Sequence, residues 1–81
     1  MTRKAVVFGG SGFIGSHVAD LLSMEGYSVT IFDAVRSPWL RPNQNFVEGD
    51  ITRKTDVDPA IEGASVVYNF AALADLNAAL K

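Results

Sequence analysis

The residues best suited to chemistry lie near the N-terminus, where four glycines fall within positions 9–15, Gly-Gly-Ser-Gly-Phe-Ile-Gly. Two overlapping patterns share Gly12 and Gly15: G-x-G-x-x-G begins at Gly10, and G-x-x-G-x-x-G begins at Gly9. Glycines at this spacing permit a tight turn, let a pyrophosphate approach the backbone and allow a helix to pack closely. The N–H groups that open the helix then face the phosphates. The segment predicts a phosphate-binding turn. The residues expected to hold the pyrophosphate are Gly9, Gly12, Phe13, Ile14 and Gly15.

An acid follows the glycine segment at a useful distance. Asp33 lies 21 positions after Gly12, at the end of an expected strand. A carboxylate there accepts hydrogen bonds from the adenosine ribose hydroxyls and repels a 2′-phosphate, which favours NAD over NADP. Arg36 weakens that preference, because an arginine can meet a phosphate. The alternative is that the glycines only make a turn and Asp33 is a surface acid. The agreement of strand, turn, helix and acid disfavours it.

Composition excludes several other classes of protein. The 81 residues carry a formal net charge of -2, so nothing predicts a nucleic-acid partner. There is no cysteine and only one histidine, which excludes disulfide scaffolds and Cys- or multi-His metal sites. A metal site made of carboxylates alone stays open as an alternative, but no spacing favours it. No targeting signal or membrane-spanning apolar run is present, so we expect no membrane partner and a cytoplasmic location.

The elements that position these residues follow from the apolar pattern. Short apolar runs predict strands over Lys4–Phe8, Ser28–Phe32, Phe46–Glu48 and Ser65–Phe70. Helices are expected over Phe13–Glu25, Thr55–Ile61 and Ala71–Lys81. In the first helix, Ile14, Val18, Leu21 and Leu22 are expected to form the buried face, with Ser16 on the opposite side. Thr55 or Asp56 is expected to cap the second helix.

Strands alternating with helices predict an α/β fold with parallel βαβ units. Right-handed crossovers leave few topologies. The expected fold class is a Rossmann-like doubly wound parallel sheet, of which this chain supplies the N-terminal part. It should contain about four strands in the order 3-2-1-4.

Four motifs in one order resemble those of the NAD-dependent epimerase/dehydratase family, the extended short-chain dehydrogenase/reductases. They are the turn at 9–17, Asp33, Gly49-Asp50-Ile51 and Asn69-Phe70-Ala71-Ala72. The resemblance implies NAD as cofactor, with Asp50 and Ile51 at the adenine and Phe70, Ala71 and Ala72 along the nicotinamide-side half. Asp50 as a plain turn residue and 70–72 as plain core remain alternatives.

Family members typically interconvert or dehydrate nucleotide sugars by oxidising a sugar carbon transiently. Their chains are several times longer, and their catalytic Tyr-x-x-x-Lys is absent here, because Ile31 follows Tyr27 and Ala72 follows Tyr68 at that spacing. We therefore expect residues 1–81 to be the N-terminal part of an NAD-binding domain, without catalytic residues, metal ligands or a substrate domain. The intact enzyme would take a nucleotide-sugar substrate and could form a homodimer. The alternatives are a stand-alone, non-catalytic dinucleotide sensor and a truncated remnant that acts through its sheet edge.

The remaining candidate site residues are expected to have ordinary structural roles. His17 is expected on the helix surface or in packing. Ser11 suits either a phosphate contact or a plain turn. Trp39 is expected to be a partly buried loop aromatic, with a cover over the adenine or a contact to another domain as alternatives. The basic residues Arg36, Arg41, Arg53 and Lys54 are too scattered to form a patch.

Overall fold

The computed structural model describes residues 2–71, so Ala72 and the helix expected after Ala71 lie outside the described residues. The elements in chain order are β1 (Lys4–Phe8), α1 (Phe13–Met24), β2 (Ser28–Asp33), β3 (Gln44–Glu48), α2 (Lys54–Ile61) and β4 (Ala64–Asn69). Each matches an element expected from the sequence, with ends that differ by two residues at most. Most of these elements begin or end beside glycine, proline or polar residues, which interrupt the apolar pattern of the sequence.

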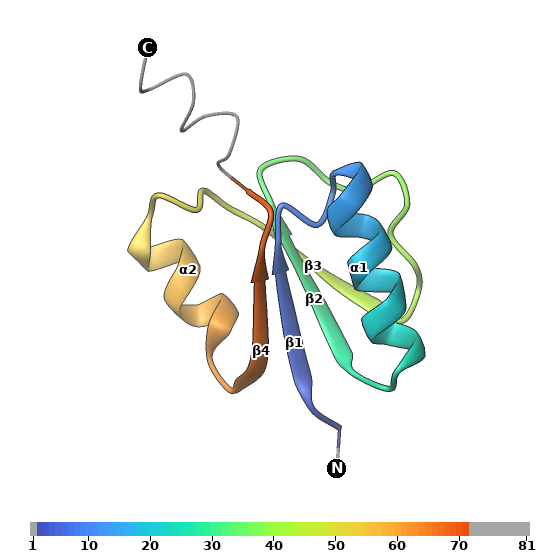
Figure 1. The fold of residues 1–81 in the computed structure, drawn as a ribbon. Helices are drawn as coiled ribbons and strands as arrows, with labels where there is room; N and C mark the ends of the chain where they lie inside the picture. The colour runs from blue at the N-terminus through green and yellow to red at the C-terminus, as the bar shows by residue number, and fades with distance from the viewer. Residues whose placement is uncertain (1, 72–81) are drawn as a thin grey trace.

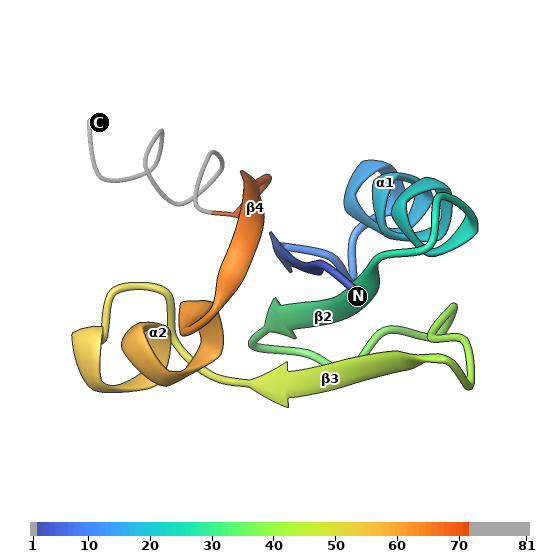
Figure 2. The ribbon, with the colours of Figure 1, turned by 90° about the horizontal axis from the view of Figure 1, so that it is seen from below.

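The strands form one parallel sheet in the order β3-β2-β1-β4 (Figure 1), which confirms the predicted topology. Phe8 lies opposite Phe32 on one neighbour and opposite Asn69 on the other. The helices α1 and α2 lie on opposite faces of the sheet (Figure 2). Because every strand runs the same way, the segments that follow all four strands emerge at one edge.

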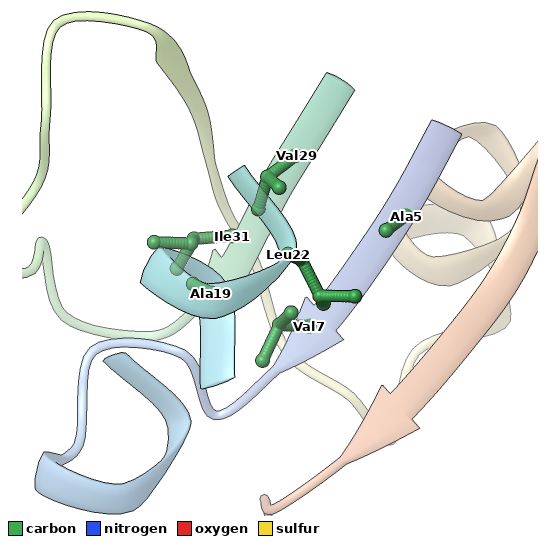
Figure 3. Close-up of a cluster of buried hydrophobic side chains, with 6 residues drawn as sticks. All are labelled: Ala5, Val7, Ala19, Leu22, Val29 and Ile31. Atoms are coloured by element: carbon green, nitrogen blue, oxygen red, sulfur yellow. The ribbon is translucent and has the colours of Figure 1, made fainter. Parts of the chain in front are cut away.

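The central strand β1 supplies side chains to two separate cores. Its residues alternate between the faces, so Ala5 and Val7 point toward α1, whereas Val6 and Phe8 point toward α2. All four are almost fully buried. The alternation explains why the strand is a continuous apolar run. The first core, shown in Figure 3, consists of Ala5, Val7, Ala19, Leu22, Val29 and Ile31.

The buried face of α1 differs from the predicted one. Ile14 and Leu21 are 64% and 62% exposed, and of the four expected residues Leu22 alone is buried. The buried residues are Gly15, Ser16, Ala19 and Leu22, of which the first three are small. The predicted exposure of Ser16 was therefore wrong, and its hydroxyl donates to the Phe13 carbonyl oxygen at 2.9 Å. At the start of α1, Gly15 lies against the backbone of the glycine turn, which leaves no room for a side chain at that position.

The connection from β2 to β3 is tied to α1 by one acid. Arg41 Nε lies 2.8 Å from Asp20 Oδ1, and the Gln44 side chain donates to the same oxygen at 3.0 Å. The hydrogen bond from Arg41 holds the pKa of Asp20 below its usual range, so this carboxyl stays ionised. The ion pair and the bond from Gln44 thus connect α1 to the segment that leads into β3.

The second helix has no side-chain cap at its N-terminus. Its N-cap residue is Arg53, so the expectation that Thr55 or Asp56 caps it was wrong. The Asp56 carboxylate instead accepts the Asp50 N–H at 3.0 Å.

No helix within residues 2–71 is long and apolar enough to cross a bilayer.

We predict that Ile31→Ala lowers the free energy of unfolding by about 3 kcal/mol, because it leaves a cavity in the first core. Ile31 is 1% exposed. Urea denaturation followed by circular dichroism measures the change. Met24→Ala, at a residue that is 81% exposed on α1, is the control and should change stability by about 0.5 kcal/mol or less. Equal urea midpoints for the two variants would contradict the packing described here.

Candidate functional site

Two adjoining clefts open at the edge where the four strands end. The first, which we call the acid cleft, has a volume of about 460 Å³ and is lined by Gly9, Gly12, Phe32, Asp33, Ala34, Gly49, Asp50, Ile51, Phe70 and Ala71. The second, the glycine cleft, has a volume of about 370 Å³ and is lined by Gly9, Gly12, Phe13, Ile14, Gly15 and Phe70. Gly9, Gly12 and Phe70 line both clefts, so the two clefts are direct neighbours where the strands end.

This site brings together every described residue that was predicted to hold a cofactor. The acid cleft contains Gly9, Gly12, Asp33, Asp50, Ile51, Phe70 and Ala71. The glycine cleft adds Phe13, Ile14 and Gly15. Ala72, the remaining predicted residue, lies outside the described residues. Residues up to 62 positions apart in the chain thus meet at one edge, because that is where parallel strands deliver the segments that follow them.

The turn after β1 requires glycine at its first position. Gly9 has a φ of +75°, a conformation that other residues rarely adopt. A Cβ there would also lie 2.6 Å from the Ala71 nitrogen. The Gly9 N–H donates to the Phe32 carbonyl oxygen at 2.9 Å. The turn is therefore packed between the ends of β2 and β4.

Gly15 sets how closely α1 approaches this turn. A Cβ on Gly15 would lie 2.9 Å from the Gly10 Cα and still closer to the Gly9 carbonyl oxygen. Gly15, the last glycine of the motif, was expected to let the helix pack closely against the strand. The structure shows that the close neighbour is the backbone of the turn itself.

The start of α1 presents backbone amides to the glycine cleft. Its N-cap residue is Gly12, which has no side chain to accept a hydrogen bond from the first amides. The first amides of any α-helix also lack partners within the helix, and the helix dipole gives this end a partial positive charge. The arrangement suits a bound anion such as a phosphate.

Asp33 links the glycine turn to the end of β2. One carboxylate oxygen accepts the Ser11 N–H at 3.1 Å, and the other accepts the Val35 N–H at 3.2 Å. The Ser11 hydroxyl donates to the Val35 carbonyl oxygen. These bonds hold the carboxylate in the acid cleft while leaving acceptor capacity for hydroxyl donors, because each oxygen carries two lone pairs.

Asp50 supplies the second carboxylate of the acid cleft. Its Oδ1 accepts the Thr52 N–H at 2.9 Å and the Thr52 hydroxyl at 2.6 Å. The bond from the Thr52 hydroxyl holds the pKa of Asp50 below its usual range, so the group is an acceptor at neutral pH.

Several features of the site were not found from the sequence. Phe32 and Ala34 also line the acid cleft, although neither type of residue marks a site. Thr52 and Asp56 hold the segment around Asp50, and only the Asp-x-Thr spacing of a side-chain turn could have suggested the first of them.

The other aromatic candidates lie outside the two clefts. Trp39 is 51% exposed and lines a separate groove along α1 with Phe13 and His17. It therefore does not cover the acid cleft. His17 Nδ1 lies 2.9 Å from the Phe13 carbonyl oxygen, and its ring packs on the Phe13 ring at 4.5 Å, which confirms its expected helix-surface packing role.

A parallel 3-2-1-4 sheet with a glycine turn after β1 and an acid at the end of β2 defines a Rossmann-type dinucleotide-binding fold. The sequence of residues 5–81 matches the model of the NAD dependent epimerase/dehydratase family. The chain therefore belongs to this family, whose cofactor is NAD.

Similar proteins include enzymes of two kinds. A mouse (Mus musculus) sterol-4-alpha-carboxylate 3-dehydrogenase, decarboxylating, is 38% identical over 69 residues, which are 85% of this chain and 19% of the mouse protein. The structure of the Thermotoga maritima UDP-glucose 4-epimerase with UDP-glucose superposes with a TM-score of 0.81 at 32% identity, covering 89% of this chain and 25% of that one. The Brucella ovis UDP-glucose 4-epimerase in complex with NAD has a TM-score of 0.79 at 31% identity, covering 94% and 27%. The chain thus spans about a fifth to a quarter of the length of these proteins.

We predict that Gly15→Ala and Gly12→Ala affect the chain differently. The first places a Cβ against backbone atoms and should lower the free energy of unfolding by about 2 kcal/mol. The second places a Cβ 3.5 Å from the Gly9 carbonyl oxygen, an ordinary contact, and should change stability by about 1 kcal/mol or less. Gly12→Ala should nevertheless weaken NAD binding, because its methyl group occupies the space through which a phosphate reaches the amides. Urea unfolding and an NAD titration of each variant measure the two effects, and unweakened NAD binding by Gly12→Ala would contradict the phosphate site.

Proposed function

We propose that residues 1–81 form the NAD-binding, N-terminal part of a Rossmann domain in a nucleotide-sugar epimerase or dehydratase. The single observation that carries this proposal is the meeting of ten candidate residues from four strand ends around two connected clefts. The glycine turn, the two acids and the segment after β4 are then the parts that hold one extended ligand.

Each part of the coenzyme has chemically suitable partners in the proposed site. The pyrophosphate lies against Gly9, Gly12, Phe13, Ile14 and Gly15, with the first amides of α1 as its donors. The N–H groups of Gly9 and Gly12 are not among these donors, because they bond to the carbonyl oxygens of Phe32 and Gly9. Asp33 accepts hydrogen bonds from the ribose hydroxyls, and Asp50 and Ile51 meet the adenine. Phe70 and Ala71 lie along the nicotinamide-side half.

The acid cleft favours NAD over NADP. Its lining residues include two carboxylates, Asp33 and Asp50, and no lysine or arginine. Arg36, the residue that could have met a 2′-phosphate, has its guanidinium over the Phe46 ring at 5.6 Å from the centroid. A 2′-phosphate in this cleft would face negative charge without a compensating cation.

When bound, NAD accepts a hydride from a substrate carbon, and an epimerase or dehydratase later returns it. The residues of this chain hold and orient that acceptor. The proton transfers of such a reaction need a general base, and neither tyrosine has a lysine four positions on. We therefore expect the 81-residue chain to bind coenzyme weakly and to turn over no substrate.

A nucleotide sugar is the proposed substrate of the intact enzyme, because the similar Thermotoga structure was determined with UDP-glucose. A sterol is the second candidate, since the mouse sterol dehydrogenase has the higher identity, 38% against 32%. Both candidates need the same coenzyme half. Residues 1–81 are proposed to bind only NAD, so they do not distinguish a nucleotide sugar from a sterol as the substrate.

Calorimetric titrations of the chain with NAD, NADP and ADP-ribose test the proposed function. We expect NAD and ADP-ribose to bind at millimolar concentrations, and NADP to bind more weakly. Asp33→Asn should weaken NAD binding by about 5-fold and reduce the difference between NAD and NADP, because the charge that repels the 2′-phosphate is lost.

Asp58→Asn is the matched control for this loss of charge. Asp58 lies on α2 and pairs with Lys54 at the surface, away from both clefts. Its replacement should leave both affinities unchanged. Equal binding of NAD and NADP by the wild-type chain, or no binding of either at millimolar concentration, would refute the proposed function.

A further inference from the structure

The segment that follows β3 is held by two side chains that do not line either cleft. Thr52 donates two hydrogen bonds to Asp50 Oδ1, one from its N–H at 2.9 Å and one from its hydroxyl at 2.6 Å. Asp56, in the first turn of α2, accepts the Asp50 N–H at 3.0 Å. Both the side chain and the backbone of Asp50 are therefore fixed by neighbours in the chain.

The segment also packs closely against the sheet. A Cβ on Gly49 would lie 2.6 Å from the Phe32 ring and 3.2 Å from the Asp56 Cβ. The Gly49 N–H donates to the Asp33 carbonyl oxygen at 3.1 Å. Gly49 thus lies against Phe32 and Asp56 with no room for a side chain, and the Asp50 carboxylate beside it is oriented by its bonds to Thr52.

The bonds from Thr52 distinguish the two oxygens of the Asp50 carboxylate. Both go to Oδ1, so Oδ2 takes no part in this turn. Asp50 itself is exposed and lines the acid cleft beside Ile51. A carboxylate with one oxygen engaged presents its second oxygen as an acceptor in a defined direction.

We propose that Thr52 and Asp56 are positioning residues that give the acid cleft its selectivity for a base with an exocyclic amino group. This inference rests on the proposed function, in which the adenine of NAD lies at Asp50. An amino group donates a hydrogen bond to the oriented oxygen. A base with a carbonyl group at the same position places two acceptors opposite each other, which is repulsive.

Nuclear magnetic resonance titration of the 15N-labelled chain tests this inference with two dinucleotides. The probes are NAD and nicotinamide hypoxanthine dinucleotide, in which a carbonyl replaces the adenine amino group. The wild-type chain should bind NAD about 5-fold more tightly than the hypoxanthine dinucleotide. Thr52→Val removes the hydroxyl donor and keeps the N–H, so the ratio of the two affinities should fall to about 2-fold or less. Thr52→Ser keeps the hydroxyl and should retain the wild-type ratio.

Matched variants separate positioning from a merely structural effect. Thr55→Val makes the same substitution at an exposed threonine in the first turn of α2 and should leave the ratio unchanged. Asp56→Asn keeps an oxygen that accepts the Asp50 N–H, whereas Asp56→Ala does not. We expect Asp56→Ala to reduce the ratio more than Asp56→Asn does.

The outcomes distinguish this inference from the proposed function. A variant at Thr52 that weakens both dinucleotides equally would show only a structural role and would overturn the inference. A wild-type chain that binds both dinucleotides equally well would also overturn it, while leaving the NAD site intact. A wild-type chain that binds neither would refute the proposed function and the inference with it.

Discussion

The carbonyl oxygen of Gly9 and the absent side chain of Gly15 set the distance between α1 and the sheet. Because the two backbones are in direct contact there, the first amides of α1 come to lie beside the ends of the strands. The same closeness selects small residues such as Ser16 and Ala19 for the buried face of the helix. The glycine cleft and the packing of the first core thus have one cause. A larger residue at position 15 would change both together.

The two acids at this edge combine structural and ligand-binding roles. Asp33 accepts backbone N–H groups from the glycine turn and from the segment after β2, and Asp50 accepts two bonds from Thr52. In each case, neighbours in the chain determine where the carboxylate points. The rigidity matters because an oriented acceptor discriminates between donors better than a mobile one. The charges are arranged as well, since the start of α1 brings the partial positive charge of the helix dipole to the glycine cleft, and two carboxylates line the acid cleft.

Local sequence patterns predicted the strands and their order because the apolar runs, glycines and acids all indicate the same fold. The ten described candidate residues also came together at one edge, since their positions at strand ends determine where they emerge. The buried face of α1 was predicted wrongly, because helical periodicity weighs Ile14 and Leu21 by their hydrophobicity and cannot include a backbone contact at Gly15. Asp56 was one of two residues predicted to cap α2, because that prediction also used only the local sequence. Its actual partner, the Asp50 N–H, comes from a different turn, and only the three-dimensional arrangement brings them together.

The outer strand β4 affects how the isolated chain behaves in solution. Val67 and Tyr68 are 48% and 41% exposed, and within the described part of the chain no further strand lies beyond β4. An apolar strand with unpaired N–H and C=O groups is a template for another extended segment. Within the described residues, β4 is therefore the edge of the sheet that offers pairing to a second chain. The opposite edge strand, β3, favours such pairing less than β4 does, because Asn45 and Glu48 place a polar and a charged side chain on it.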